Sequence, residues 1–171
     1  MGTRLLSENL IRKRFPHIRY VRIHSVGKHM ANIYAWNDQL RLEEEDRIAL
    51  KRFAATDLAP YVCFKVKEYS KVQEEAVPRV DDVPDNVLRA AMNRSLDLQG
   101  IVSVMNEMFS SGRIAFNEYN PWSGLIHWSV NTPSALTEIE KELIHRYLYE
   151  LVPLGATFEI QYDQEREHSS R

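Results

Sequence analysis

The chain has 171 residues, of which 44% are hydrophobic and 27% are charged, as in an ordinary globular protein. A chain of this size buries roughly two-thirds of its unfolded surface, so it needs neither a metal nor a disulfide in order to fold. Its single cysteine, Cys63, excludes an intramolecular disulfide and favours a reducing compartment. No apolar run approaches the roughly 20 residues of a membrane helix, and the first residues lack the apolar stretch of a signal peptide. We therefore expect a cytoplasmic protein.

Charge is distributed unevenly along the chain. Residues 1–30 hold seven Lys or Arg against a single Glu, a net charge of +6, whereas the whole chain carries −2. The remaining residues, 31–171, therefore carry −8. Such asymmetry is typical of a surface for nucleic acid or another polyanion. It is equally typical of two oppositely charged faces that attract each other within or between chains.

The first 69 residues predict one unit in the order helix, strand, strand, helix, strand. Pro16 ends the first helix, and Pro60 is expected to stop the second. The closing strand alternates in polarity, with Val62, Phe64 and Val66 on one face. The five elements are expected at residues 3–15, 18–25, 30–36, 41–58 and 61–69.

The same order begins again after residues 70–84, which hold two prolines and no periodic apolar face and so predict a linker. Gly100 is expected to divide the long helical pattern that follows into two helices. Thr137 and Glu140 fit a capping box at the start of the last helix, which Pro153 ends. The elements are expected at residues 85–111, 113–119, 125–130, 134–152 and 156–162, and a polar, disordered tail is expected at 163–171.

The two units also match residue by residue, which indicates an internal duplication. At an offset of 93 residues Leu50 aligns with Leu143. The closing strands match better at 94, where Phe64 aligns with Phe158, so one inserted residue is expected at 154–155. We therefore predict an α+β fold made of two ferredoxin-like α-β-β-α-β units, each a three-stranded sheet with helices on one face.

The periodic patterns also predict which side chains form the core. The last helix should bury one apolar stripe, made of Leu136, Ile139, Leu143, Tyr147 and Leu151 and broadened by Ile144 and Leu148. Across the whole chain, the residues expected to be mostly buried are Val62, Phe64, Val66, Leu143, Tyr147, Phe158 and Ile160.

Residues able to do chemistry are scattered and form no known catalytic motif. The sequence contains no HExxH, CxxC or GxSxG motif and no glycine-rich phosphate loop. His24, His29, His127 and Cys63 are of the types that bind zinc. Unclustered histidines and a lone thiol in a strand are better explained as structural. We expect no catalytic site, no metal and no cofactor.

The strongest polar feature is the basic segment RKRFPHIRYVR at residues 12–22. It interleaves cations with Phe15, His17 and Tyr20, a combination that single-stranded nucleic acid needs for its phosphates and bases. Alternatively, the cations favour the helix C-terminus and line a solvated strand face. The candidate nucleic-acid contacts are Arg12, Lys13, Arg14, Arg19 and Arg22.

An aromatic turn is the second candidate surface. Trp122 lies in a Pro-Trp-Ser-Gly turn between two expected strands, and Tyr119 lies close to it in the sequence. A large aromatic side chain in a turn either packs locally under a neighbouring helix or meets a partner. Both interpretations stay open, and Tyr119 and Trp122 are candidate protein contacts.

The run TPSALTEIEKELIHRYLYELVPLGATFEIQY, together with the hairpin before it, resembles a module of phage tail and baseplate proteins. In that module a strand hairpin precedes a helix, a proline or glycine break, and a closing strand. The resemblance covers residues 113–162 and is echoed over 18–67, and ring-building domains of secretion systems share it. It implies a structural subunit that has no catalytic residues.

We therefore predict a non-catalytic assembly or protein-interaction protein that contacts no membrane. The open edges of two small sheets favour a homo-oligomer or a protein partner. Two alternatives remain. One is nucleic-acid binding through the basic segment, and the other is binding of a small ligand in the cleft between the two halves.

Overall fold

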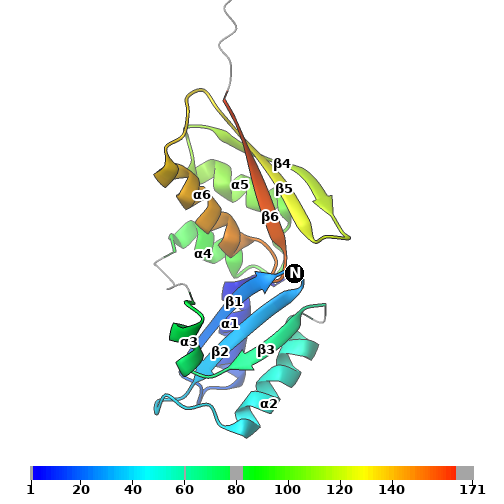
Figure 1. The fold of residues 1–171 in the computed structure, drawn as a ribbon. Helices are drawn as coiled ribbons and strands as arrows, with labels where there is room; N and C mark the ends of the chain where they lie inside the picture. The colour runs from blue at the N-terminus through cyan, green and yellow to red at the C-terminus, as the bar shows by residue number, and fades with distance from the viewer. Residues whose placement is uncertain (1, 60, 78–82, 165–171) are drawn as a thin grey trace, which may run out of the picture.

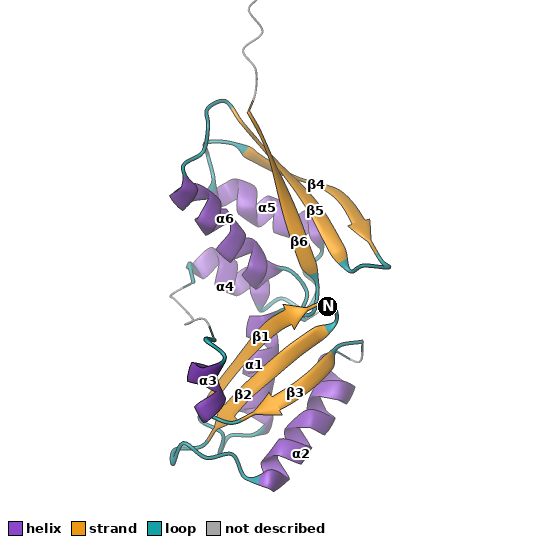
Figure 2. Ribbon diagram, viewed as in Figure 1, coloured by secondary structure: helices purple, strands orange, loops and turns teal. Residues whose placement is uncertain are grey.

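The computed structural model describes residues 2–59, 61–77 and 83–164. They form two units stacked end to end, and the longer helices of each unit pack on one face of a three-stranded sheet (Figure 1; Figure 2). The fold is α+β with two similar units, as the sequence predicts. None of the described helices is long and apolar enough to cross a membrane.

The first unit opens with helix α1 (Arg4–Arg14) and a strand hairpin. Thr3 caps the helix, because its side chain accepts a hydrogen bond from an N–H group that has no partner within the first turn. Strands β1 (Tyr20–Gly27) and β2 (Met30–Trp36) then pair antiparallel. These elements lie within about two residues of the predicted ranges.

A helix then leads to the third strand of the first sheet. Helix α2 (Glu44–Phe53) carries three acidic residues in its first turn, where the helix dipole favours negative charge. It continues into a π-helical turn, η1 (Ala54–Leu58), which the sequence pattern does not distinguish from α-helix. Strand β3 (Cys63–Lys67) returns parallel to β2. Pro60, expected to stop the helix, lies outside the described residues.

The second unit begins with two helices where the sequence predicts a division. Helix α4 (Asp85–Ala91) and helix α5 (Leu98–Met108) are separate, but Gly100 does not divide them. The break lies before Asp97, whose side chain accepts the Gly100 N–H at 2.7 Å and caps α5. Gly100 therefore belongs to the first turn of the second helix.

The rest of the second unit repeats the order of the first. Strands β4 (Arg113–Asn120) and β5 (Leu125–Thr132) form an antiparallel hairpin. Helix α6 (Glu138–Leu151) begins with the predicted capping box. Strand β6 (Thr157–Gln164) then runs parallel to β5. The tail expected from residue 163 begins within this strand, and residues 165–171 lie outside the described residues.

The duplication predicted from the sequence is confirmed by the topology. The strand orders are β1-β2-β3 and β4-β5-β6, with the same antiparallel and parallel pairings. Phe64 lies opposite Ala31 on the middle strand of its sheet, and Phe158 lies opposite Ile126 in the other. In each unit the helix between the second and third strands supplies the crossover that parallel pairing requires.

Helix α6 buries one side of the expected stripe, the side that Ile144 and Leu148 were expected to broaden, and not its centre. Ile144, Leu148 and Leu151 are buried, whereas Ile139 is 71% exposed. The buried stripe is centred about 100° further around the helix, one residue along the chain. Leu143 lies at the margin of the stripe, half-buried.

This face also corrects the alignment of the two units. Leu50 and Ala54 are fully buried on α2 and η1, and they lie 94 residues before Ile144 and Leu148. The offset of 94 therefore holds for helix and strand alike. The extra residue expected at 154–155 is not needed.

The residues predicted to be buried are buried in the first unit, but several of those predicted for the second unit are only half-buried. Val62, Phe64 and Val66 are buried. Phe158 and Ile160 face their core but are only half-buried, as is Tyr147. β3 and β6 are both edge strands, so this difference between the two units does not come from the position of the strand in its sheet.

Residues of the expected linker cover the outer face of the first sheet. Helix α3 (Ser70–Glu74) follows β3 directly, and the Tyr34 hydroxyl donates a hydrogen bond to Glu75 at 2.5 Å. The Tyr69 ring packs against Trp36 with centroids 5.0 Å apart. Burial and the hydrogen bond to Glu75 raise the pKa of Tyr34 to about 12. Residues 78–82 of the expected linker lie outside the described residues.

Candidate functional site

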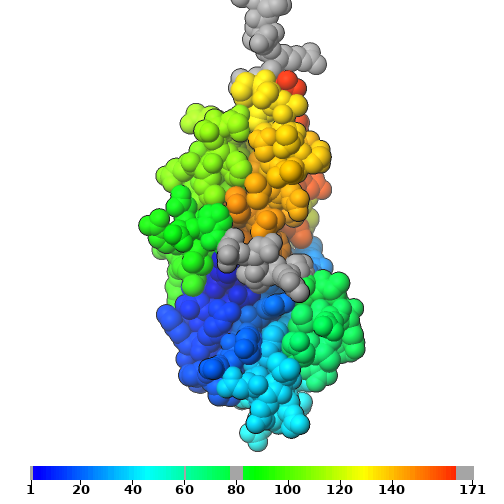
Figure 3. All heavy atoms as spheres, turned by 90° about the vertical axis from the view of Figure 1, so that its left-hand side faces the viewer, coloured from blue at the N-terminus to red at the C-terminus, as the bar shows by residue number. Residues whose placement is uncertain are grey.

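The first turns of α1 tie the two units together. Ile11 belongs to the core of the first unit, whereas Leu5 packs against the core of the second. The Thr3 hydroxyl donates a hydrogen bond to the carbonyl oxygen of Ala91, at the end of α4, at 2.6 Å. Figure 3 shows the dark blue residues of α1 directly beneath the green of α4. The first helix therefore belongs to both units.

A buried ion cluster lies at this junction. The Arg4 guanidinium contacts Glu8 Oε1 at 2.6 Å and Glu150 Oε1 at 2.7 Å, and Glu8 also accepts the backbone N–H of Ile23 at 2.9 Å. Burial opposes the charge of Arg4, but Glu8 and then Glu150 outweigh it, so the pKa of Arg4 is raised. Buried charges need such partners, and here the partners come from both units.

A second set of polar contacts runs beside this cluster. The Tyr149 hydroxyl of α6 accepts the backbone N–H of Ser25 at 3.1 Å and lies 3.2 Å from His24 Nδ1. Burial, and then the positive charge of Arg4, lower the pKa of His24. His24 is therefore biased towards its neutral form at the contact between β1 and α6.

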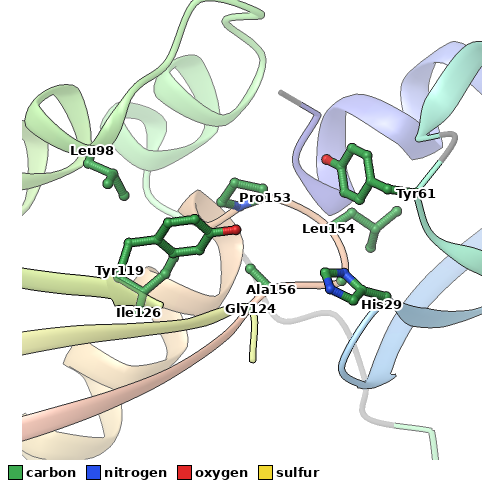
Figure 4. A pocket seen from close by; sticks show the side chains of 10 residues that line it. His29, Tyr61, Leu98, Tyr119, Gly124, Ile126, Pro153, Leu154 and Ala156 are labelled. Atoms are coloured by element: carbon green, nitrogen blue, oxygen red, sulfur yellow. The ribbon is translucent and has the colours of Figure 1, made fainter. Parts of the chain in front are cut away.

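An open cavity of about 330 Å³ lies between the two units (Figure 4). The first unit contributes His29 and Tyr61 to its wall. The second unit contributes Leu98, Tyr119 and the loop at 153–156, among others. The wall is mainly apolar, so the cavity would favour an aromatic or aliphatic group.

Gly155 allows the loop at 153–156 to close against the first unit. Its φ of +84° is one that side chains disfavour, and a Cβ atom there would lie 2.8 Å from Val62 Cγ2. Its carbonyl oxygen accepts the backbone N–H of His29 at 3.0 Å. His29 itself has a φ of +52°, in the turn between β1 and β2. The loop at 153–156 and the turn between β1 and β2 therefore contact each other through their backbones where the two units meet.

Three exposed aromatic side chains, here called the aromatic rim, belong to or adjoin this cavity. Tyr61 is 49% exposed, Tyr119 is 45% exposed and Trp122 is 86% exposed. Burial, and then the neighbouring Tyr119 of the second unit, raise the pKa of Tyr61. Trp122 lies in the β4–β5 turn, two residues before Gly124 of the cavity wall. The interpretation that Trp122 packs under a helix is wrong, because its side chain is solvated.

The basic segment is divided among different surroundings. Arg12 donates to the carbonyl oxygen of Val21 at 3.3 Å, and Arg19 pairs with Asp38 at 2.7 Å. Arg22 lies between two core-facing residues of β1, so its side chain projects from the sheet face opposite α1. Arg12, Lys13 and Arg14 lie together in the last turn of that helix. Nucleic-acid binding by this segment stays a prediction.

The four candidate zinc ligands do not come together at one place in the structure. The backbone N–H of Cys63 donates to the carbonyl oxygen of His29 at 2.8 Å, so these two residues are neighbours. His24 contacts Tyr149, and His127 Nδ1 lies 3.7 Å from Glu159 on the second sheet. Within the described ranges, no three His, Cys, Asp or Glu side chains gather in a way that could hold a metal ion. The lone thiol expected in a strand, Cys63, is exposed at the start of β3.

The sequence identified part of the aromatic rim and predicted a cleft between the two halves, but it did not indicate which residues line that cleft. Tyr119 and Trp122 stand out because they flank a turn. Tyr61 and Leu98 come from different units, and no local pattern places them together. The loop at 153–156 has a visible Pro-Leu-Gly sequence, but its contact with the first unit depends on how the two units stack.

Comparisons with known proteins give a distant structural likeness. No protein-family model and no curated protein matches the chain. Two similar solved structures are periplasmic domains of PrgH, one of them described as the T3SS inner membrane protein from S. typhimurium. Each has a TM-score of 0.32 and 12% identity, over 93% of this chain and 68% of the other. At this level the likeness carries no inference about function.

Proposed function

We propose that the chain is a non-catalytic assembly subunit that associates through the junction between its two units. The observation that carries this proposal is the aromatic rim, with Trp122 at 86% exposure on a turn. Trp and Tyr dominate the binding energy of protein interfaces, and an isolated soluble chain gains nothing from a solvated tryptophan. The rim adjoins a mainly apolar cavity. No group of side chains that could hold a metal ion is found among the described residues.

We assign no particular machine to the chain, because the phage-tail and secretion-system resemblances are both distant. A reducing, cytoplasmic location is part of the same proposal. It is supported by Cys63, an exposed thiol that would be prone to oxidation elsewhere.

Light scattering of the purified chain over a range of concentrations tests the assembly proposal. We expect the mean mass to rise above that of the 20.0 kDa monomer as concentration increases. The measurement is repeated at low and high salt, because opposite charges between copies would be screened by salt. A monomer at every concentration and both salt levels would contradict self-assembly.

Binding of a small ligand is the second candidate, and the cavity is the observation that favours it. A volume of about 330 Å³ is at the lower end of the range for small-molecule sites, and its wall combines apolar groups with two tyrosine hydroxyls. Thermal denaturation in the presence of a panel of small aromatic alcohols and acids would test it. Stabilisation that is abolished by Leu98→Phe would support a site there, and no shift with any compound would count against it.

A further inference from the structure

The junction combines a projecting side chain and a cavity on the same part of the surface. Trp122 projects from the β4–β5 turn, and that turn is held in place by Asn120, whose side chain accepts the backbone N–H of Trp122 at 2.9 Å. Gly124 completes the turn with a φ of +65° and forms part of the cavity wall. The exposed indole is therefore presented on a turn whose backbone is ordered, so the backbone loses little conformational freedom on binding.

The cavity has the size and chemistry for one indole ring. It is mainly apolar, and Tyr61 and Tyr119 face it from opposite units (Figure 4). A buried indole requires one acceptor for its N–H group, and either tyrosine hydroxyl can accept a hydrogen bond. Trp122 is 86% exposed in its own chain, so it does not fill this cavity itself.

We propose that two copies of the chain pair about a twofold axis at the junction, with Trp122 of each copy inserted in the cavity of the other. This inference rests on the proposed assembly function and names the partner as a second copy. A projection and a cavity that are neighbours on one surface satisfy each other reciprocally under a twofold rotation. If they lay on opposite sides of the molecule, the same contact would produce an open chain of copies.

The charges of the two units favour this arrangement. Residues 1–69 contain 13 Lys or Arg and 8 Asp or Glu, a net charge of +5. Residues 85–162 contain 5 and 9, a net charge of −4. The units are stacked with the junction between them (Figure 1). A twofold axis across the stacking direction places the positive unit of one copy beside the negative unit of the other, which is electrostatically favourable.

Tryptophan fluorescence can follow this contact directly. The chain has three tryptophans, and Trp36 and Trp128 are 5% and 0% exposed, so Trp122 is the solvated one. We expect the emission to shift to shorter wavelength, and acrylamide quenching to fall, over the same concentration range in which light scattering detects the dimer. A short-wavelength emission from Trp122 in the monomer would overturn the proposal, because the indole would then occupy its own cavity.

Three variants define the interface. Trp122→Ala removes the projection, and Leu98→Phe fills the cavity from the α5 side. Each should weaken dimerisation by roughly 30-fold or more, the loss expected for an interface hot spot. Ala156→Leu fills the same cavity from the opposite loop and replaces Leu98→Phe if that variant does not fold. Ile139→Ala is the matched control, because it removes an exposed apolar side chain from the far end of α6 and should leave the dimer intact.

Mixing the variants tests the reciprocity. Trp122→Ala keeps its cavity and Leu98→Phe keeps its tryptophan, so the mixed pair can form one of the two contacts. We expect the mixture to associate more strongly than either variant alone. If the wild type dimerises and both variants dimerise as strongly as the wild type, the twofold insertion of Trp122 is wrong and the assembly function stands. A wild type that stays monomeric would overturn the assembly function itself, and growth beyond a dimer would overturn the twofold pairing.

Discussion

His24 links the charge state of one side chain to the contact between the two units. Its Nδ1 lies 3.2 Å from the Tyr149 hydroxyl, and burial, followed by Arg4, lowers its pKa. The unfolded chain therefore binds this proton more readily than the folded chain. The contribution of neutral His24 is fully present above the ordinary histidine pKa of about 6.5 and is lost as pH falls below it.

We therefore expect the free energy of unfolding to fall between about pH 7.5 and about pH 5.5, the window in which histidine titrates. Urea denaturation at the two pH values measures this change. His24→Gln should make the fall smaller, because glutamine keeps a polar side chain that does not titrate. His127→Gln is the control on the second sheet, and an equal reduction from both variants would contradict the role given to His24.

Phe64 and Phe158 occupy equivalent positions but differ in burial. Phe64 is 4% exposed, and Phe158 is half-buried beneath the His145 ring, with centroids 4.8 Å apart. Phe64→Ala should cost about 3–5 kcal/mol of unfolding free energy. Phe158→Ala should cost about 1–2 kcal/mol, because less apolar surface is re-exposed. Urea titration of both variants compares them, and equal costs would show that β6 is better covered than its exposure indicates.

Helix α6 begins with a signal that is fully local. The Thr137 side chain accepts the Glu140 N–H, and the Glu140 side chain accepts the Thr137 N–H, both at 3.2 Å. Thr137→Ala removes one half of this capping box and should lower stability by about 1 kcal/mol. Ser134→Ala, which changes an exposed hydroxyl before the helix, is the control. Thermal denaturation would contradict the role of the cap if the two variants lose the same stability.

The elements show which features a single sequence can predict. The capping box of α6, the alternation of β3 and the order of strands and helices follow from neighbouring residues, and the structure confirms them. The buried face of α6 was misplaced because Ile139 and Ile144 are both apolar, and only packing decides between them. The covering of Tyr34 by residues around α3 depends on contacts between distant segments, which no local pattern contains.

The junction depends on one cation that contacts both units. Arg4→Met removes the partner that Glu150 and Glu8 share, and it leaves the buried Glu8 carboxylate with fewer donors. We expect a loss of about 3–5 kcal/mol in the free energy of unfolding, typical for breaking a buried ion pair. Arg12→Met is the control, because Arg12 is largely exposed and lies 3.8 Å from Glu8. A loss below about 1 kcal/mol for Arg4→Met in urea titration would contradict the structural role of the cluster.

Nucleic-acid binding by the basic segment would produce a different signature across the whole molecule. Each phosphate neutralised releases counterions, so the affinity for single-stranded RNA or DNA should fall steeply with salt. Fluorescence titration at two salt concentrations measures this slope, and Lys13→Ala together with Arg14→Ala should make it shallower. We expect weak binding, since Arg19 is paired with Asp38 and Arg22 projects from another face. Tight, steeply salt-dependent binding would favour this function over assembly.

Because α1 packs against both units, its contacts affect the order in which the chain folds. Arg4 and Glu150 are 146 residues apart in the chain, and Thr3 and Ala91 are 88 apart. During synthesis the first unit can assemble its sheet, but the beginning of its own helix finds its final partners only when α6 has emerged. Contacts between such distant residues form late, because a long loop must be closed first. Until α6 is available Arg4 lacks its partner Glu150, so the first turns of α1 cannot complete their contacts with the second unit.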